Sequence, residues 1–205
     1  VHFLRADVAH AVLNGVDTSA AEGMPGVQRI FTGADFEAVG SIHCGWLITD
    51  RHGDPMQEPR HPVLAHGKIR HVGEPICAVV ADTLAQARDA AEAIVLDYDA
   101  LPAVIDMKDA IGADAPKVHD DLTGNLCYDW GFVEENRQAV DDAIKGAAHV
   151  TTLELVNNRL IANPMEPRVA VGEYNRADDF HTLHTTSQNP HVIRLLMGAF
   201  VLGIP

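Results

Sequence analysis

Basic residues are scarce in this sequence of 205 residues, and their scarcity excludes one class of partner. Lysine and arginine total 15 against 29 aspartates and glutamates, which gives a formal net charge of -14 at pH 7. A surface of this sign repels the phosphate backbone of nucleic acids, whose binding depends on lysine and arginine. We therefore expect no nucleic-acid partner.

Long apolar runs are also absent. The longest, residues 76–81 and 195–204, fall well short of the roughly 20 residues that a helix needs to cross a bilayer. The chain does not open with a basic segment followed by an apolar one, as a secretory signal peptide would. These absences predict a cytoplasmic protein without a transmembrane segment.

Cysteine is rare, and the three cysteines are widely separated. Cys44, Cys77 and Cys127 are odd in number and form no CxxC pair. This spacing suggests neither a disulfide framework nor the thiolate set of an iron–sulfur cluster or structural zinc site. We expect reduced thiols that are mostly buried, since free cysteine packs as a small apolar side chain.

Histidine is abundant by contrast, with 12 residues, and three of them recur at regular intervals. His61, His66 and His71 are separated by five residues each. That interval places successive side chains on different faces of a helix, and Pro62 and Gly67 interrupt the segment. We therefore predict no direct metal ligands here.

The hydrophobic content of 47% is sufficient for a proper core, and the clearest periodic pattern runs from residue 68 to residue 106. Residues 76–80 predict a short buried strand, and Thr83 with Gln86 forms the reciprocal pair of a helix capping box. A second strand follows, from residue 94 or 95 to Tyr98. Strand–helix–strand order predicts an α/β or α+β layer with the helix laid on a sheet. The helix face that we expect to be buried comprises Leu84, Ala87, Ala91, Ile94 and Val95.

The region before this pattern contains shorter elements. Residues 28–32 predict a strand between turns at 24–27 and 33–35, and residues 17–22 predict a capped helical turn. Residues 40–62 are rich in glycine, proline, histidine and aspartate without periodicity, so we expect a long loop.

The second half of the chain has a different character. Residues 111–136 are irregular and acidic, which predicts a linker across a domain surface. After it, residues 140–147 predict a short helix and residues 150–156 favour β structure.

A β-hairpin and a helix are predicted at the end of the chain. Residues 169–174 and 180–186, joined by a polar turn at 175–179, have the pattern of paired strands. Apolar residues from 191 to 202 recur at helical spacing. The hairpin's second strand therefore leads through Ser187-Gln188-Asn189-Pro190 into a helix.

Two stretches carry a family resemblance, and the first is long and ordered. Residues 61–81, with the turn Gly73-Glu74-Pro75 before the apolar strand, continue through Asp97-Tyr98 to Leu101-Pro102-Ala103-Val104. They resemble the α/β hammerhead domain of molybdenum hydroxylases of the xanthine dehydrogenase and aldehyde oxidase family. With residues 17–35 added, the resemblance covers most of the first 110 residues.

The second stretch is the sharper one. Residues 158–168, containing Asn163-Pro164-Met165-Glu166-Pro167-Arg168, and residues 186–194, containing Ser187-Gln188-Asn189-Pro190, resemble the start of the molybdopterin-binding region. Their sequence resembles aerobic carbon monoxide dehydrogenase large chains, and related bacterial aldehyde and N-heterocycle hydroxylases, more than it resembles animal xanthine oxidases.

The resemblance implies a role for one residue in catalysis and cofactor binding. Gln188 matches the family glutamine whose amide approaches the molybdenum centre and hydrogen-bonds an oxygen ligand of the metal. A neutral amide offers both a donor and an acceptor without titrating. The alternative from the residues alone is that Gln188 caps the following helix or satisfies local backbone groups.

The resemblance also implies cofactors and partners. Molybdenum held by molybdopterin, in the cytosine dinucleotide form, would pass water-derived oxygen to carbon monoxide, an aldehyde or an N-heterocycle. The electrons would leave through 2Fe-2S clusters and FAD on a small iron–sulfur subunit and a medium FAD-binding subunit. This chain has neither suitable cysteines nor a dinucleotide fingerprint, so we expect a hetero-oligomer.

The expected architecture is α+β, with three segments. A hammerhead domain occupies residues 1–110, a linker residues 111–136, and the N-terminal part of a mixed α/β molybdopterin-binding domain residues 137–205. The family's Gly-rich cofactor segment and distant glutamate base are absent, so we expect a catalytically incomplete N-terminal fragment of a large subunit. The alternative is a free-standing hammerhead module that serves as a non-catalytic interaction protein.

Overall fold

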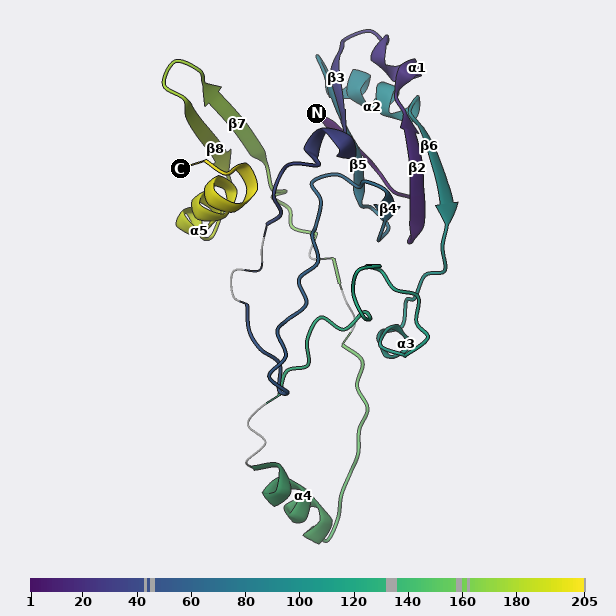
Figure 1. Ribbon diagram of the computed structural model, residues 1–205, viewed down its shortest axis with the longest axis vertical. Helices are drawn as coiled ribbons and strands as arrows, with labels where there is room; N and C mark the ends of the chain where they lie inside the picture. Colours follow the sequence, from purple (N-terminus) through teal and green to yellow (C-terminus); the bar gives the residue numbers. More distant parts are fainter. Residues whose placement is uncertain (43, 45–46, 132–135, 158–159, 162, 205) are drawn as a thin grey trace. The chain divides into compact units, whose positions relative to one another are not determined.

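The computed structural model describes residues 1–42, 44, 47–131, 136–157, 160–161 and 163–204. The chain divides into two compact units, which we describe separately. Figure 1 labels the helices and strands of both. The first comprises Val1–Trp130 with Leu196–Pro205, and the second comprises Gly131–Leu195. Three residues of the second resemblance stretch, Asn158, Arg159 and Ala162, lie outside the described residues.

In its described part, the first unit contains two antiparallel sheets of three strands each. One sheet has the order β1(His2–Arg5), β5(Pro75–Ala81), β3(Val27–Thr32). The other has the order β4(Lys68–Ile69), β2(Ala11–Asp17), β6(Val95–Ala100). The predicted strand–helix–strand unit is confirmed as β5, α2(Leu84–Glu92) and β6, but its two strands belong to different sheets.

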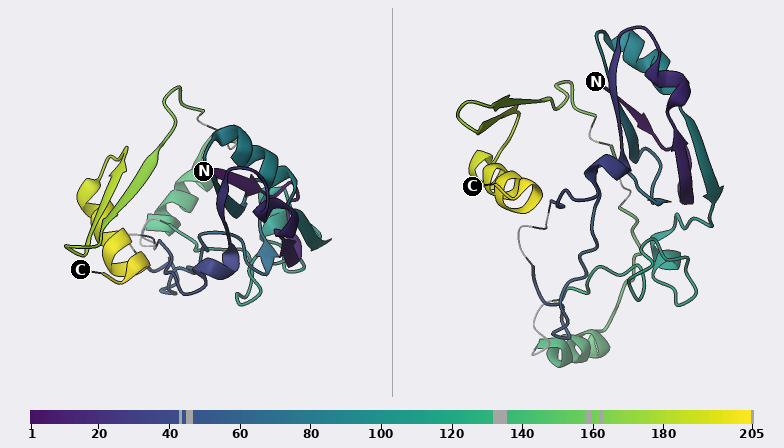
Figure 2. Two further views of the ribbon diagram at one scale, coloured as in Figure 1. Left: turned by 90° about the horizontal axis from the view of Figure 1, so that it is seen from above. Right: turned by 45° about the horizontal axis from the view of Figure 1, so that its top comes forward.

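The core of this unit lies where α2 packs on β5 and β1 (Figure 2). On β5, Ile76, Cys77 and Val79 have no exposed surface, as the apolar pattern predicts. Burial in this apolar setting raises the pKa of the Cys77 thiol to about 11. The other two cysteines, Cys44 and Cys127, are exposed, so the expectation of mostly buried thiols is wrong for them.

The predicted buried face of α2 is confirmed at its centre and wrong at its ends. Ala87, Ala91 and Ile94 are buried, whereas Leu84 is 50% exposed and Val95 is 62% exposed. Leu84 is the first residue of the helix and Val95 already begins β6, so neither follows the helical face into the core.

The N-terminus of α2 carries the predicted capping box. Thr83 Oγ1 accepts a hydrogen bond from the Gln86 backbone N–H at 3.2 Å, and Gln86 Oε1 accepts one from the Thr83 backbone N–H at 3.0 Å. The Gln86 side chain also packs against Gly26, whose φ of 80° lies in the left-handed region that favours glycine. One pair of side chains therefore starts the helix and supports the predicted turn at residues 24–27.

Short elements surround these strands. The helical turn predicted at residues 17–22 is confirmed as α1(Ser19–Glu22), and the turn predicted at residues 33–35 is the 3-10 helix η1(Gly33–Phe36). The Ser19 backbone N–H donates to Asp17 Oδ1 at 3.0 Å. The pKa of Asp17 is lowered by hydrogen bonding to the Ser19 side chain and, to a smaller extent, to this backbone N–H.

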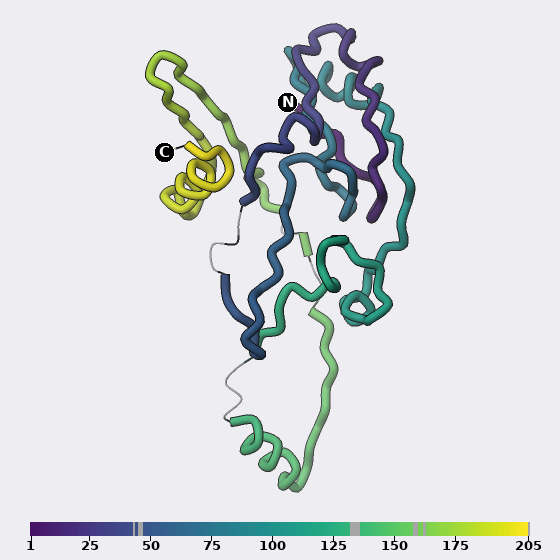
Figure 3. Tube along the Cα trace, in the orientation of Figure 1, coloured from purple at the N-terminus to yellow at the C-terminus, as the bar shows by residue number. Residues whose placement is uncertain are grey.

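The long loop predicted at residues 40–62 is confirmed, since its described residues contain only an isolated bridge between Thr49 and Pro55. This loop runs beside the stretch just before the second unit (Figure 3). The Gln57 backbone N–H donates to the Cys127 carbonyl at 2.8 Å, and Arg51 forms an ion pair with Asp129 at 2.7 Å. These contacts hold the loop against Cys127 and Asp129, which lie far away in the sequence.

The acidic stretch after α3(Met107–Ala110) is ordered rather than loose. Asn125 Oδ1 accepts from the Val118 backbone N–H at 2.9 Å, while Asn125 Nδ2 donates to the carbonyls of Ala110 and Pro116. Lys68 of β4 reaches the same stretch and donates to both carboxylate oxygens of Asp120, at 2.8 and 2.9 Å. The first half of the predicted linker therefore lies fixed on the first unit.

The second unit contains α4(Arg137–Gly146), which corresponds to the helix predicted at 140–147, and the predicted hairpin of β7(Ala170–Asn175) and β8(Phe180–Thr185). The β structure expected at residues 150–156 is wrong, because this stretch is irregular and exposed. A strand needs a neighbour for its backbone hydrogen bonds, and this stretch pairs with no strand among the described residues.

The helix predicted at residues 191–202 is confirmed, and it consists of two helical types. It begins as α5(Pro190–Leu195) in the second unit and continues as the π-helix η3(Leu196–Leu202), which belongs to the first unit. Apolar spacing at every third or fourth residue predicts a helical path. It does not distinguish the hydrogen-bond pattern of an α-helix from that of a π-helix.

We predict that replacing Thr83 by alanine destabilises the first unit by about 1 kcal/mol, because the N-terminus of α2 loses its capping hydrogen bond. The measurement is the urea unfolding midpoint by circular dichroism. Thr123→Ala is the matched control, since Thr123 is exposed and outside any helix or strand. Equal midpoints for the two variants would contradict the capping role.

The Lys68–Asp120 pair generates a second prediction. The hydrogen bond from Lys68 is the main cause of the lowered pKa of Asp120. A carboxylate whose pKa is lower in the folded state stabilises the fold above its unfolded pKa, and this stabilisation is lost as pH falls through the folded pKa. At pH 7, Asp120→Asn should therefore lower the free energy of unfolding by up to about 1 kcal/mol.

The difference between wild type and Asp120→Asn should shrink toward zero as the pH falls below the ordinary carboxyl pKa of 3.8. Urea titrations at a series of pH values measure it. The control is Asp121→Asn, which removes the adjacent exposed carboxylate without touching the contact to Lys68. A difference for Asp120→Asn that stays constant down to pH 2 would refute the assignment.

Candidate functional site

Gln188, the residue predicted to contact a cofactor, lies between the hairpin and the helix of the second unit. β8 ends at Thr185 and α5 begins at Pro190, so Gln188 stands in the short connection between them. Its side chain is exposed. The connection is anchored on both sides by regular structure, which suits a group that must be held in one orientation.

The hairpin before Gln188 is a regular platform. Its six residue pairs run without a register shift from Ala170 opposite Thr185 to Asn175 opposite Phe180. Thr185 extends the pairing by one contact, because its Oγ1 donates to the Val169 carbonyl at 3.0 Å. The end of β8, from which Gln188 follows, is thus tied to the neighbouring strand.

Residues other than Gln188 organise the start of the helix. Ser187 Oγ accepts a hydrogen bond from the Asn189 backbone N–H at 3.0 Å, and the Asn189 carbonyl accepts one from Ile193 at 3.0 Å. The amide of Gln188 makes no hydrogen bond within the described part of the chain. Ser187 thus satisfies the backbone N–H of Asn189 just before α5, and the amide of Gln188 remains able to bind another group.

The donor set of this connection is neutral. Ser187, Gln188 and Asn189 provide a hydroxyl and two amides, which hydrogen-bond oxygen atoms well and are poor direct ligands for a transition metal. This set fits contact with oxygen atoms of a cofactor. Across the residues that the structure describes, no group of three or more histidine, cysteine, aspartate or glutamate side chains could hold a metal ion.

The hairpin also carries polar pairs that the sequence patterns did not single out. The rings of Tyr174 and His181 stack with centroids 4.6 Å apart, and these two residues are direct partners across the strands. The Tyr174 hydroxyl donates to Asp179 Oδ1 at 2.9 Å, and this hydrogen bond raises the pKa of Tyr174. On the other face of the hairpin, His184 lies 3.4 Å from Glu173. Strand alternation with known register could have identified both pairs.

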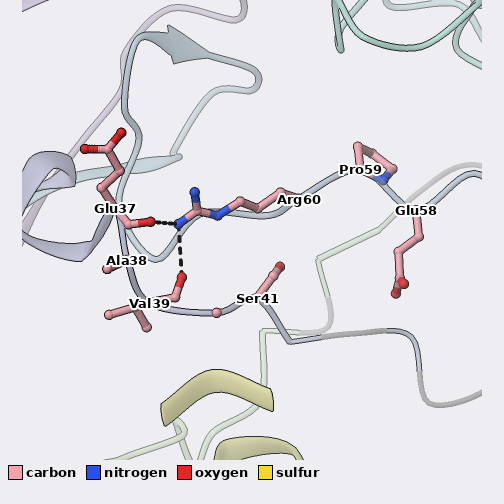
Figure 4. A pocket seen from close by; sticks show the side chains of 8 residues that line it. Glu37, Ala38, Val39, Ser41, Glu58, Pro59 and Arg60 are labelled. Carbon is pink, nitrogen blue, oxygen red and sulfur yellow. Dashed lines mark hydrogen bonds between the residues drawn. The ribbon is translucent and has the colours of Figure 1, made fainter. Parts of the chain in front are cut away.

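A cavity of about 420 Å³ lies in the first unit, between the segments 37–41 and 58–60. One guanidinium nitrogen of Arg60 donates to the carbonyls of Phe36, Glu37 and Val39, at 3.3, 2.5 and 3.0 Å. Figure 4 shows the contacts with Glu37 and Val39. These carbonyls belong to the last residue of the 3-10 helix η1 and to residues just after it, so the arginine satisfies backbone groups at a helix end. Arg60 thus serves the fold at this cavity.

The regularly spaced histidines do not gather into one site. The rings of His61 and His71 lie 6.4 Å apart, and His66 is not their partner in any described ring contact or ion pair.

No helix in the described residues is long and apolar enough to span a membrane.

Two family models match the chain in succession. Residues 1–102 match the aldehyde oxidase and xanthine dehydrogenase a/b hammerhead domain. Residues 118–205 match the molybdopterin cofactor-binding domain. Only the stretch 103–117 lies outside both matches.

The chain is similar in sequence to the large subunits of known enzymes. The chain is 31% identical to the nicotine 6-hydroxylase large subunit of Paenarthrobacter nicotinovorans, over 97% of this chain and 23% of that protein. It is 32% identical to the carbon monoxide dehydrogenase large chain of Hydrogenophaga pseudoflava, over 98% of this chain and 25% of that protein. The chain therefore spans about a quarter of the length of these relatives.

Solved structures give the same result. Quinoline 2-oxidoreductase from Pseudomonas putida 86 matches with a TM-score of 0.81 and 30% identity, over 98% of this chain and 25% of that chain. Aldehyde oxidoreductase from Desulfovibrio gigas matches with a TM-score of 0.78 and 27% identity, over 100% of this chain and 22% of that chain.

Proposed function

We propose, because the chain belongs to the aldehyde oxidase and xanthine dehydrogenase family, that it is part of the large, molybdopterin-binding subunit of a molybdenum hydroxylase. The observation that carries this proposal is the order of the two matches. A hammerhead domain is followed by a cofactor-binding domain, and relatives match across both. The predicted α+β fold, with a hammerhead domain followed by the start of a molybdopterin-binding domain, is confirmed at the level of family and fold.

The proposed reaction is an oxidation that inserts water-derived oxygen into a carbon substrate, or oxidises carbon monoxide. The relatives support this class by their names, which include a nicotine hydroxylase, a carbon monoxide dehydrogenase and an aldehyde oxidoreductase. This chain alone would be an incomplete catalyst, since it corresponds to about a quarter of those proteins.

The proposed domain organisation keeps a hammerhead domain at 1–110, a linker at 111–136 and the beginning of a cofactor-binding domain at 137–205. The succession of family matches supports the order of the two domains, although the second match begins at residue 118, within the proposed linker.

The proposed cofactor is molybdenum bound to molybdopterin, in the cytosine dinucleotide form. When bound, this group supplies the redox chemistry of oxygen transfer. The residue of this chain that would contact it is Gln188, which lies exposed at the end of a regular hairpin. Its amide can donate and accept hydrogen bonds at once and keeps the same charge at every physiological pH, so it would orient its partner without exchanging a proton.

The proposed partners are a medium subunit that binds FAD and a small subunit with 2Fe-2S clusters. Relatives are named as a large subunit, a large chain and a subunit of a complex, which supports a hetero-oligomeric assembly. The three separated cysteines of this chain offer no cluster site of their own, so electrons would pass to other subunits.

A free-standing hammerhead interaction module is the alternative. It explains the family match of residues 1–102. It does not explain why residues 118–205 match a cofactor-binding domain. One measurement distinguishes the two functions. If the chain is part of a molybdenum hydroxylase, the intact protein that carries it, purified with its bound subunits, should contain molybdenum by elemental analysis. A preparation that is folded and free of molybdenum and pterin would favour the interaction module.

We predict that Gln188→Ala lowers turnover by about 10- to 100-fold, the range for loss of a group that orients a metal centre through its ligands. The measurement combines steady-state kinetics with molybdenum(V) electron paramagnetic resonance. The spectrum should change while the molybdenum content stays close to that of the wild type.

The matched control for this experiment is Gln138→Ala. Gln138 is an exposed glutamine of the same unit whose side chain bonds only Asp142 within α4 in the described structure. Its replacement should leave turnover and spectrum unchanged. Wild-type turnover together with a wild-type spectrum in Gln188→Ala would remove Gln188 from the site while leaving the proposed function of the protein intact.

A further inference from the structure

A set of polar side chains lies on the outer face of the sheet β4–β2–β6, opposite the core. Val12 of β2 pairs with Lys68 of β4, and Ala11 pairs with Ile69. His10 and Arg70 each lie one residue beyond this ladder, next to Ala11 and Ile69 in the chain. Side chains alternate between the two faces of a strand, so His10, Lys68 and Arg70 share the face away from buried Ala11 and Ile69. We call this group, together with Glu74 and Asp120, the polar junction.

The stretch before Asn125 covers the polar junction. Lys68 Nζ donates to both carboxylate oxygens of Asp120 and to the Lys117 carbonyl at 3.4 Å. As a result, His10 and Lys68 are each only 7% exposed although they lie on the outer face of a sheet. His10, Lys68 and Glu74 are therefore buried in the polar junction, while the Asp120 side chain that covers Lys68 is itself 77% exposed.

Two nitrogen atoms of the junction are buried and have no hydrogen-bond partner within the described structure: His10 Nε2 and Arg70 Nε. The other ring nitrogen of His10, Nδ1, lies 2.8 Å from the Pro102 carbonyl. A carbonyl oxygen only accepts, so Nδ1 carries the proton and Nε2 of the neutral ring is an acceptor. Arg70 Nε–H is always a donor. The two atoms are therefore complementary, and they belong to residues that directly adjoin the paired strands β2 and β4.

The charges of the junction balance. Lys68 is paired with Asp120, and Arg70 lies 3.9 Å from Glu74, whose Oε2 also accepts the Arg70 backbone N–H at 2.6 Å. His119 stands nearby, and desolvation, assisted by the charges of Arg70 and Lys68, lowers its pKa. With each cation matched by a carboxylate, the site favours a neutral ligand over an anion.

We infer that the polar junction binds one ordered water molecule, which donates a hydrogen bond to His10 Nε2 and accepts one from Arg70 Nε–H. Water is the smallest neutral molecule that donates and accepts at the same time. Buried waters of this kind typically satisfy polar groups that the fold leaves without protein partners. The bound water ties the start of β2 to the segment after β4 beneath the stretch held by Asp120.

The first test is a crystal structure of the intact protein that carries this chain, at a resolution that shows ordered waters. The expected result is a density peak of water within about 2.7–3.2 Å of both nitrogen atoms. A direct contact between the two nitrogens, an anion such as chloride at this position, or the absence of any peak would each overturn the inference.

The second test uses His10→Phe, which keeps a flat ring and removes the acceptor. The water peak should disappear in this variant and persist in the control His52→Phe, whose histidine is 65% exposed on the long loop. A water that persists at the same position in His10→Phe would show that His10 does not bind it.

Nuclear magnetic resonance of wild-type protein labelled with ¹⁵N-histidine tests the same inference without a variant. The expected result at pH 7.5 is the neutral tautomer of His10 with the proton on Nδ1. A proton on Nε2, in either the other tautomer or the imidazolium, would remove the acceptor on which the water site depends and overturn the inference.

Discussion

Burial of the apolar strand β5 is the interaction on which the first unit depends. Ile76, Cys77 and Val79 are fully buried at the centre of the sheet β1–β5–β3, with α2 packed on the same strand. Because α2 and β6 follow β5 directly in the chain, the packing of this strand also positions the second sheet. The capping box of Thr83 and Gln86 works at the junction of these elements, where the chain leaves β5 and turns into the helix.

The polar outer face of the sheet β4–β2–β6 binds the stretch around Asp120, which follows this sheet in the chain. Lys68 is buried only because the stretch around Asp120 closes over it, and Asn125 holds that stretch in shape through three backbone contacts. The second unit is organised differently. Every residue of β7 is exposed, so backbone pairing rather than an apolar core keeps the hairpin that precedes Gln188 regular.

The candidate site could be located from the sequence in outline. The hairpin and the helix start around Gln188 follow from strand alternation, a polar turn and Pro190, all of which are local patterns. The choice of Gln188 over Ser187 or Asn189 came from resemblance alone, because all three have side chains suited to capping. The structure distinguishes Ser187 from Gln188, because the Ser187 hydroxyl accepts the Asn189 backbone N–H while the Gln188 amide makes no hydrogen bond within the described residues. Two pairs on the hairpin, Tyr174 with His181 and Glu173 with His184, were missed because they depend on cross-strand register.

The sequence by itself determined the local elements of this protein: the strand at 76–80, the capped helix after Thr83, the loop at 40–62 and the terminal hairpin. Each depends on neighbours within a few residues, so propensity and spacing suffice to predict it. The tertiary structure alone decided that β5 and β6 belong to different sheets, that residues 150–156 form no strand, and that His10 and Lys68 are buried. These outcomes depend on contacts between segments far apart in the sequence, such as Lys68 with Asp120, or on the lack of a pairing partner among the described residues. No local pattern contains that information.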